Sequence, residues 1–214
     1  MPSSLLDELL ADARPIWQAM IDHPFLRELA TGTLPGERFA FWVQQDYRFV
    51  QDGIRFLGLL IARAPDEELR RGLLDAAVAF RNELAIFEEY ARQHDLSLAV
   101  EPTPICLGYA SFLLATAATG SLVEALTVLW GAEKAYYDAW SAVRARLGLA
   151  PAYARWIENW TSPQFASWVD WLGEQLAKRA NAADRPSIRA AFLATARYEY
   201  LFWDMVYTGS DWPI

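Results

Sequence analysis

Three carboxylates in this sequence stand where the surrounding pattern is apolar. Counting by threes and fours around Glu133 gives Leu126, Leu129, Tyr136 and Trp140, which would share one face of an α-helix with it. A buried carboxylate without a partner is costly, so Glu133 is expected to have a partner, to carry a proton or to line a polar cavity. Such a group is a candidate for proton transfer.

The same pattern recurs around Asp46 and Glu199. The helical neighbours of Asp46 are Phe39, Trp42 and Phe49, and those of Glu199 are Phe192, Phe202, Trp203 and Val206. One such carboxylate is readily explained as a structural residue satisfied by a tyrosine or a helix terminus. Three of them favour a common cavity, where burial and mutual repulsion would raise some proton affinities and supply both an acid and a base.

Other chemistries have few residues to use. Only His23, His94 and Cys106 are available as imidazoles and thiol, and neither histidine follows a Glu by three positions, as a di-iron carboxylate site requires. Haem needs one axial histidine, so His23 is a candidate ligand, although the following proline favours a capping or turn role. His94 is expected to contact solvent and Cys106 to be a core residue. We expect no metal ion and no cofactor.

Composition limits the class of protein. A chain of 214 residues suits one domain, residues 1–214, with a sizeable core. The net charge of −8 and the absence of clustered Lys and Arg argue against a nucleic-acid partner. The N-terminal stretch has acidic residues where a signal peptide is basic, and no apolar run approaches membrane-spanning length. We expect a soluble, cytoplasmic protein that does not enter a membrane.

The elements that must position these carboxylates are helices. Apolar residues repeat at helical spacing in nearly every segment, and no run alternates as a strand would. Turn signals divide the chain into about seven or eight helices of an antiparallel bundle. These signals are GTLP at 32–35, Pro65, EPTP at 101–104, TGS at 119–121, GLAP at 148–151, TSP at 161–163 and the region of Pro186. The fold class is therefore all-α.

An ordered set of motifs resembles the TenA/thiaminase II family over almost the whole chain. The motifs are DHPF at 22–25, GTLP at 32–35, FWVQQDY at 41–47, YARWIENWTSPQF at 153–165 and EYLFWDMVY at 199–207. The resemblance implies a haem-oxygenase-like helical bundle that usually binds no haem and often forms a homotetramer. It also implies action on the pyrimidine half of thiamin and its breakdown products.

The resemblance assigns roles to individual residues. Asp46 matches the aspartate that hydrogen-bonds the aminopyrimidine, and Glu199 matches the glutamate that handles protons during cleavage. Tyr109 and Tyr136 match tyrosines that line the pocket and hydrogen-bond within it.

Departures from the family pattern concern the nucleophile. The familiar branch has a cysteine four residues before the tyrosine matched by Tyr136, and this sequence has Ala132 there. The neighbouring Glu133 resembles the cysteine-lacking, glutamate-type branch. Two further tyrosine positions are occupied by Phe49 and Trp160, so the hydrogen bonding around the ring differs as well.

The resemblance implies hydrolysis of a C–N bond next to a 4-amino-2-methylpyrimidine ring, as in aminopyrimidine or its N-formyl derivative, with weak cleavage of thiamin itself. Glu133 would be the general base, Glu199 its partner acid, and Asp46 the anchor of the ring amine, while Phe49, Tyr109 and Trp160 enclose the ring. Deamination of the aminopyrimidine stays open. Alternatives are a non-catalytic pyrimidine- or cofactor-binding protein, a haem-oxygenase-like oxidase, and a helical domain whose acidic residues only satisfy core tyrosines. We also expect a homo-oligomer, either a tetramer or a dimer.

Overall fold

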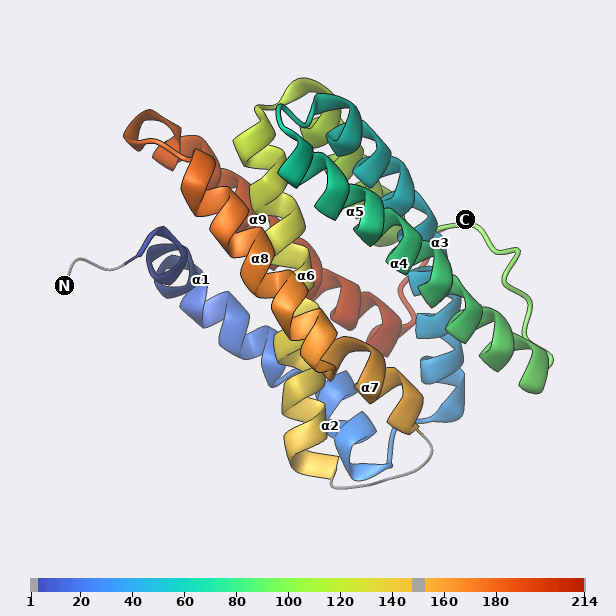
Figure 1. The fold of residues 1–214 in the computed structure, drawn as a ribbon. Helices are drawn as coiled ribbons and strands as arrows, with labels where there is room; N and C mark the ends of the chain where they lie inside the picture. Colours follow the sequence, from blue (N-terminus) through green and yellow to red (C-terminus); the bar gives the residue numbers. More distant parts are fainter. Residues whose placement is uncertain (1–3, 148–152, 214) are drawn as a thin grey trace. The chain divides into compact units, whose positions relative to one another are not determined.

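The computed structural model describes residues 4–147 and 153–213, and these residues form helices with no strand among them (Figure 1). The prediction of an all-α protein is confirmed. The α-helices within this described part are α1 Leu5–Ile21, α2 Pro24–Thr31, α3 Gly36–Arg63, α4 Glu67–Gln93, α5 Pro104–Thr119, α6 Leu122–Leu147, α7 Ala154–Thr161, α8 Pro163–Arg179 and α9 Arg185–Thr208, with a short 3-10 helix at Ala182–Asp184.

The turn signals mark the helix ends. GTLP separates α2 from α3, EPTP ends at the first residue of α5, and TGS separates α5 from α6. Ser162 caps α8 by accepting a hydrogen bond from the Phe165 amide at 3.1 Å, with Pro163 as the first helical residue. GLAP at 148–151 lies outside the described residues.

The described helices exceed the expected number because the first segment is two helices. α1 ends at Ile21 and α2 begins at Pro24, with His23 between them as the N-cap. The His23 Nδ1 accepts a hydrogen bond from the Phe25 amide at 3.2 Å. A proline disfavours helical geometry in the residue before it, which is why the chain breaks here. The expected capping role of His23 is confirmed.

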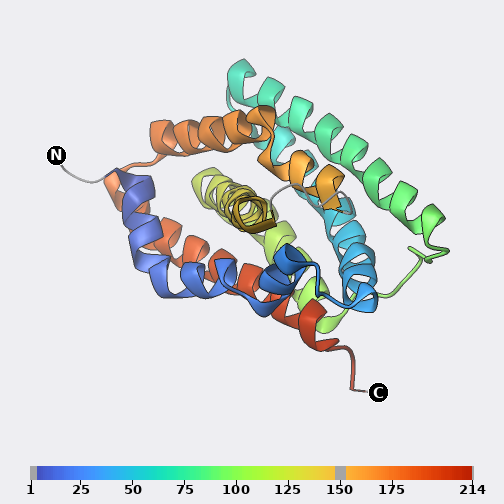
Figure 2. The same cartoon turned by 90° about the horizontal axis from the view of Figure 1, so that it is seen from below.

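The chain divides into two compact units. The first comprises Met1–Leu34 and Val123–Asp204, and the second comprises Pro35–Leu122 and Met205–Ile214. In the first unit α6 lies among α1, α8 and α9 (Figure 2). Residues 125–131 of α6 are all buried, as expected of a helix that is covered on every side.

Two glycines allow close packing in the first unit. A methyl group added at Gly131 of α6 would lie 3.1 Å from Thr195 Cγ2 of α9. At Gly173 of α8 it would lie 2.8 Å from Leu6 Cδ1 of α1 and 3.2 Å from Trp130 Nε1 of α6. These contacts fix α6 against α9 and α8 against both α1 and α6.

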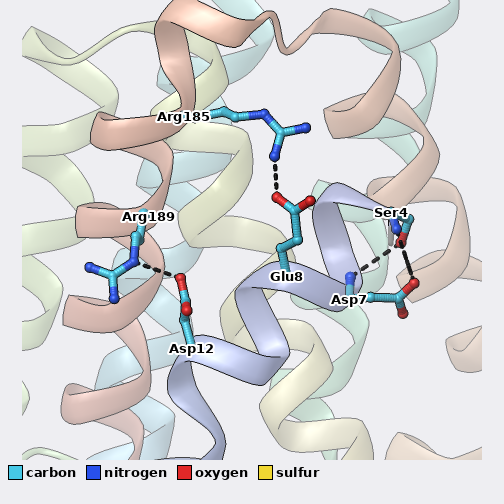
Figure 3. A network of polar contacts seen from close by, with 6 residues as sticks. All are labelled: Ser4, Asp7, Glu8, Asp12, Arg185 and Arg189. Atoms are coloured by element: carbon cyan, nitrogen blue, oxygen red, sulfur yellow. Dashed lines mark hydrogen bonds and ion pairs between the residues drawn. The ribbon is translucent and has the colours of Figure 1, made fainter. Parts of the chain in front are cut away.

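Ion pairs join α1 to α9 in the same unit. Arg189 Nε lies 2.6 Å from Asp12 Oδ2, and Arg185 pairs with Glu8 one turn away (Figure 3). Ser4 caps α1, since its hydroxyl accepts from the Asp7 amide at 3.2 Å. The four ion-pairing side chains are exposed, so the pairs contribute little stability and mainly set the register of α1.

The second unit is built on α3, α4 and α5. The Gln45 side chain of α3 holds the segment that leads into α5: its Oε1 accepts from the Thr103 amide at 2.9 Å, and its Nε2 donates to the Glu101 carbonyl at 3.1 Å. Thr103 in turn caps α5 by accepting from the Cys106 amide at 3.2 Å. The start of α5 is thereby fixed beside Asp46, the next residue on α3.

None of the described helices combines the length and the apolar character that a membrane crossing requires.

Candidate active site

Glu133 is buried on α6 and has an indole partner. Only 9% of the residue is exposed, and its Oε2 accepts a hydrogen bond of 2.9 Å from Trp168 Nε1 of α8. Burial raises the pKa of Glu133 to about 7, although the Trp168 hydrogen bond opposes the rise. A carboxyl with a pKa near neutrality is well matched to accept a proton and release it again.

Glu199 lies on the face of α9 that is turned toward α6. Thr195, Glu199 and Trp203 are spaced by four residues and therefore share one side of the helix. Thr195 meets α6 at Gly131, and the Trp203 ring centroid lies 5.7 Å from that of Tyr136 on α6. Glu199, which is 1% exposed, stands between these two contact points.

Aromatic rings surround Tyr136 in the first unit. The Tyr136 ring meets Trp160 of α7 edge-on with centroids 5.5 Å apart, and it meets Trp203 of α9 at an interplanar angle of 31°. Trp160 is itself stacked on Trp140 at 4.9 Å. The first unit therefore brings four of the predicted residues, Glu133, Tyr136, Trp160 and Glu199, onto α6 and the helices packed against it.

The second unit brings together the other predicted residues. The rings of Phe49 on α3 and Tyr109 on α5 are 4.6 Å apart and inclined by 31°. Asp46 precedes Phe49 by one helical turn and is fully buried. Asp46, Phe49 and Tyr109 thus belong to one α3–α5 contact.

Cys106 lies at this same contact as a buried thiol. Its Sγ is 3.5 Å from the Gln45 carbonyl, and burial together with the nearby Asp46 and Asp52 raises the pKa of the thiol to about 12, while Arg48 acts in the opposite direction. A thiol with that pKa is not a nucleophile at neutral pH. The prediction of a core cysteine is confirmed.

The histidines have structural positions. The Nε2 of His23 lies 3.6 Å from Asp204 Oδ1, while its Nδ1 caps α2, so both ring nitrogens face protein groups. Burial lowers the pKa of His23, and Asp204 partly opposes that effect. His94 is exposed at the end of α4, as expected. Within residues 4–147 and 153–213, no group of three His, Cys, Asp or Glu side chains is arranged to hold a metal ion.

Sequence reasoning missed the partner of Glu133. A partner was one of the three expectations for Glu133, and the only partners considered for a structural carboxylate were a tyrosine or a helix terminus, whereas the donor is the Trp168 indole, 35 residues further along. The available signal was Trp168 itself, a residue with one N–H donor inside a helical segment. Spacing along one helix carries no information about pairing with another.

Solved structures with the same fold include members of one family. A TenA homologue from Pyrococcus furiosus superimposes with a TM-score of 0.91 at 32% identity, over 95% of this chain and 100% of that one. A protein with a haem oxygenase-like fold from Shewanella denitrificans has a TM-score of 0.76 at 16% identity, over 95% of this chain and 92% of that one. The fold is therefore the haem-oxygenase-like helical bundle that the motifs implied.

The family is shown by the sequence as well. The model of the TENA/THI-4/PQQC family matches residues 10–209, and this chain belongs to that family. Relatives named aminopyrimidine aminohydrolase occur in Halalkalibacterium halodurans, 29% identical over 98% of both chains, and in Helicobacter pylori, 29% identical over 93% of this chain and 96% of that one.

Proposed function

We propose that this protein is a thiamin-salvage hydrolase, which cleaves a C–N bond of aminopyrimidine or N-formyl aminopyrimidine breakdown products. Full-length relatives at 29% identity carry the name aminopyrimidine aminohydrolase. The observation that carries the proposal is Glu133, a buried carboxyl with a pKa of about 7 next to an alanine at the position of the family's cysteine.

In this proposal the three carboxylates have different roles: a general base, a general acid and a binding group for the ring amine. Glu133 accepts a proton from water as the water oxygen bonds to the carbon of the scissile C–N bond. Glu199 supplies the proton that the departing nitrogen takes up with its electron pair, and Asp46 binds the ring amine. The net reaction adds one water across one C–N bond and needs no cofactor.

The remaining predicted residues hold the pyrimidine. Phe49, Tyr109 and Trp160 contact the ring faces, and Tyr136 contributes a hydroxyl. Their present contacts are ring-to-ring, which suits a flat aromatic substrate. Ala132 cannot add to a ring as a thiolate does, so thiamin is expected to be cleaved weakly or not at all.

Parallel incubations with aminopyrimidine, its N-formyl derivative and thiamin, followed by mass spectrometry of the products, test the proposal. Turnover of either of the first two with thiamin largely intact is the expected result. Ring binding by calorimetry without any product would instead support the non-catalytic pyrimidine-binding protein, and absence of both binding and turnover would leave only the structural interpretation of the carboxylates.

We further propose that the protein acts in the cytoplasm as a homo-oligomer, a tetramer or a dimer. Light scattering coupled to gel filtration tests the oligomeric state, since a mass equal to one 24.2 kDa chain at micromolar concentration would rule it out.

A further inference from the structure

Trp168 holds Glu133 in a way that packing alone does not require. The indole nitrogen of tryptophan is a donor only, and here it is 2.9 Å from one carboxylate oxygen, Oε2. The Trp168 ring is stacked on Trp171, with centroids 5.3 Å apart and planes inclined by 20°. This stacking within α8 fixes the plane of the indole and hence the direction of its N–H.

We propose that Trp168 is a positioning residue for the hydrolysis: its indole N–H holds Oε2 of Glu133, so that Oε1 is the oxygen that takes the proton from water. The inference rests on the proposed function. The proton passes to Oε1 while the water oxygen bonds to carbon, and the C–N electron pair leaves with the nitrogen, which is protonated by Glu199. Trp168 exchanges no proton and does not touch the substrate.

The hydrogen bond also selects the charged form of Glu133. A donor to a carboxylate favours ionisation, whereas burial opposes it, and the pKa of about 7 reflects both. Without the indole N–H, burial would still raise the pKa of Glu133 and no hydrogen bond from Trp168 would oppose it. Glu133 would then hold its proton at neutral pH and could not act as a base.

Other titratable side chains lie on the helices of the first unit near this carboxyl. On α9 Glu199 is on the face turned toward α6, and on α6 itself Tyr136 follows Glu133 by one turn. Lys134 pairs with Asp138 at 2.6 Å, and Asp138 also accepts from Trp17 of α1 at 2.9 Å. On α8 the side of the helix that carries Trp168 continues through Gln164, Trp171 and Gln175, which do not titrate.

The test compares Trp168→Phe with Trp171→Phe. Both substitutions remove an indole N–H from α8 and keep an aromatic ring, but only the first removes the donor to Glu133. Trp168→Phe should lower kcat at pH 7 about tenfold with KM changed less than twofold, and it should move the acidic limb of the kcat/KM profile to higher pH by about one unit. Trp171→Phe keeps an aromatic ring to stack on Trp168 and leaves the Trp168 N–H in place, so it should retain the parent profile. Trp168→Met gives a second donor-free variant if the first folds poorly.

A double substitution separates positioning from packing. In a Glu133→Gln background, Trp168→Phe should change kcat less than twofold, because the carboxylate that it positions is gone. A structural role predicts the same loss in both backgrounds and no movement of the pH limb, and either result would overturn the proposal.

A measurement without substrate distinguishes this inference from the proposed function. The Glu133 side-chain carbon, labelled with ¹³C and assigned by its absence in Glu133→Gln, should titrate near pH 7 in the parent protein and higher in Trp168→Phe. Equal midpoints refute the role of Trp168 whatever the enzyme turns over. Shifted midpoints in a protein that hydrolyses none of the offered substrates refute the proposed function and the positioning role that rests on it, leaving only the hydrogen bond.

Discussion

Replacing Glu133 by glutamine should abolish most activity and stabilise the fold at the same time. The pKa of this carboxyl rises from its usual 4.5 to about 7 in the folded protein, because burial disfavours the charged form. Between these values the folded state binds more protons than the unfolded state, so the free energy of unfolding falls as the pH rises from 4.5 through 7.

The size of this effect follows from the pKa difference. At 1.36 kcal/mol per pH unit, the rise costs the folded protein roughly 3 kcal/mol above pH 7 and nothing below pH 4.5. Glutamine carries no charge at any of these pH values, and its carbonyl oxygen still accepts the hydrogen bond from Trp168. Glu133→Gln should therefore raise the free energy of unfolding at pH 8 by up to about 3 kcal/mol and leave it nearly unchanged at pH 4.5.

Loss of a general base costs about 10²-fold or more in kcat. The assays are product formation by mass spectrometry and urea unfolding at pH 4.5 and pH 8, with Glu174→Gln on the exposed side of α8 as the matched control. Activity within a few-fold of the parent would remove Glu133 from the chemistry. A Glu133→Gln protein that is less stable than the parent at pH 8 would refute the electrostatic reasoning itself.

Three further outcomes are expected. Phe49→Ala removes the ring that lies against Tyr109 and should weaken binding of 4-amino-2-methylpyrimidine about 2- to 10-fold, measured by calorimetry. His23 has a lowered pKa, so the unfolded state binds the extra proton first and stability should fall as the pH drops below 6.5. His23→Asn keeps a capping acceptor but does not titrate, and should flatten this part of a plot of melting temperature against pH. Finally, we propose that residues 1–214 form a single domain, for which circular dichroism and tryptophan fluorescence should report coincident unfolding transitions, whereas separate midpoints would show that the two units unfold independently.

Much of the fold was predictable because the signals are local. Apolar spacing by threes and fours identified helices, and residues such as Pro104 and Ser162 marked where they begin. The boundary between α1 and α2 was not among the predicted turn signals. The effect of Pro24 on the conformation of His23 was predicted, but not that a new helix begins there. Burial of the three carboxylates was predictable from the same spacing.

The pairing of side chains could not be predicted in this way. The hydrogen bond from Trp168 to Glu133 and the approach of Cys106 to Asp46 depend on which helix faces pack against one another. The sequence indicates only that each face is apolar. Gly131 is an example: the need for a glycine there can be recognised only once Thr195 is known to lie opposite it. A single sequence therefore specifies helices and candidate groups, while the chemistry of each group is set by its partners in space.

The contacts between α1 and α9 also bear on how this chain is made. The Glu8–Arg185 and Asp12–Arg189 pairs each join residues 177 positions apart, and the Trp17 ring is stacked on Phe192 at 5.4 Å. During synthesis α1 leaves the ribosome long before α9 has been translated, so the Trp17 ring lacks its Phe192 partner until nearly all of residues 1–214 have been made. α1 is thus synthesised before both α8 and α9, the helices that supply its Gly173 and Phe192 contacts, and a nascent-chain chaperone would meet its Trp17 side before Phe192 covers it.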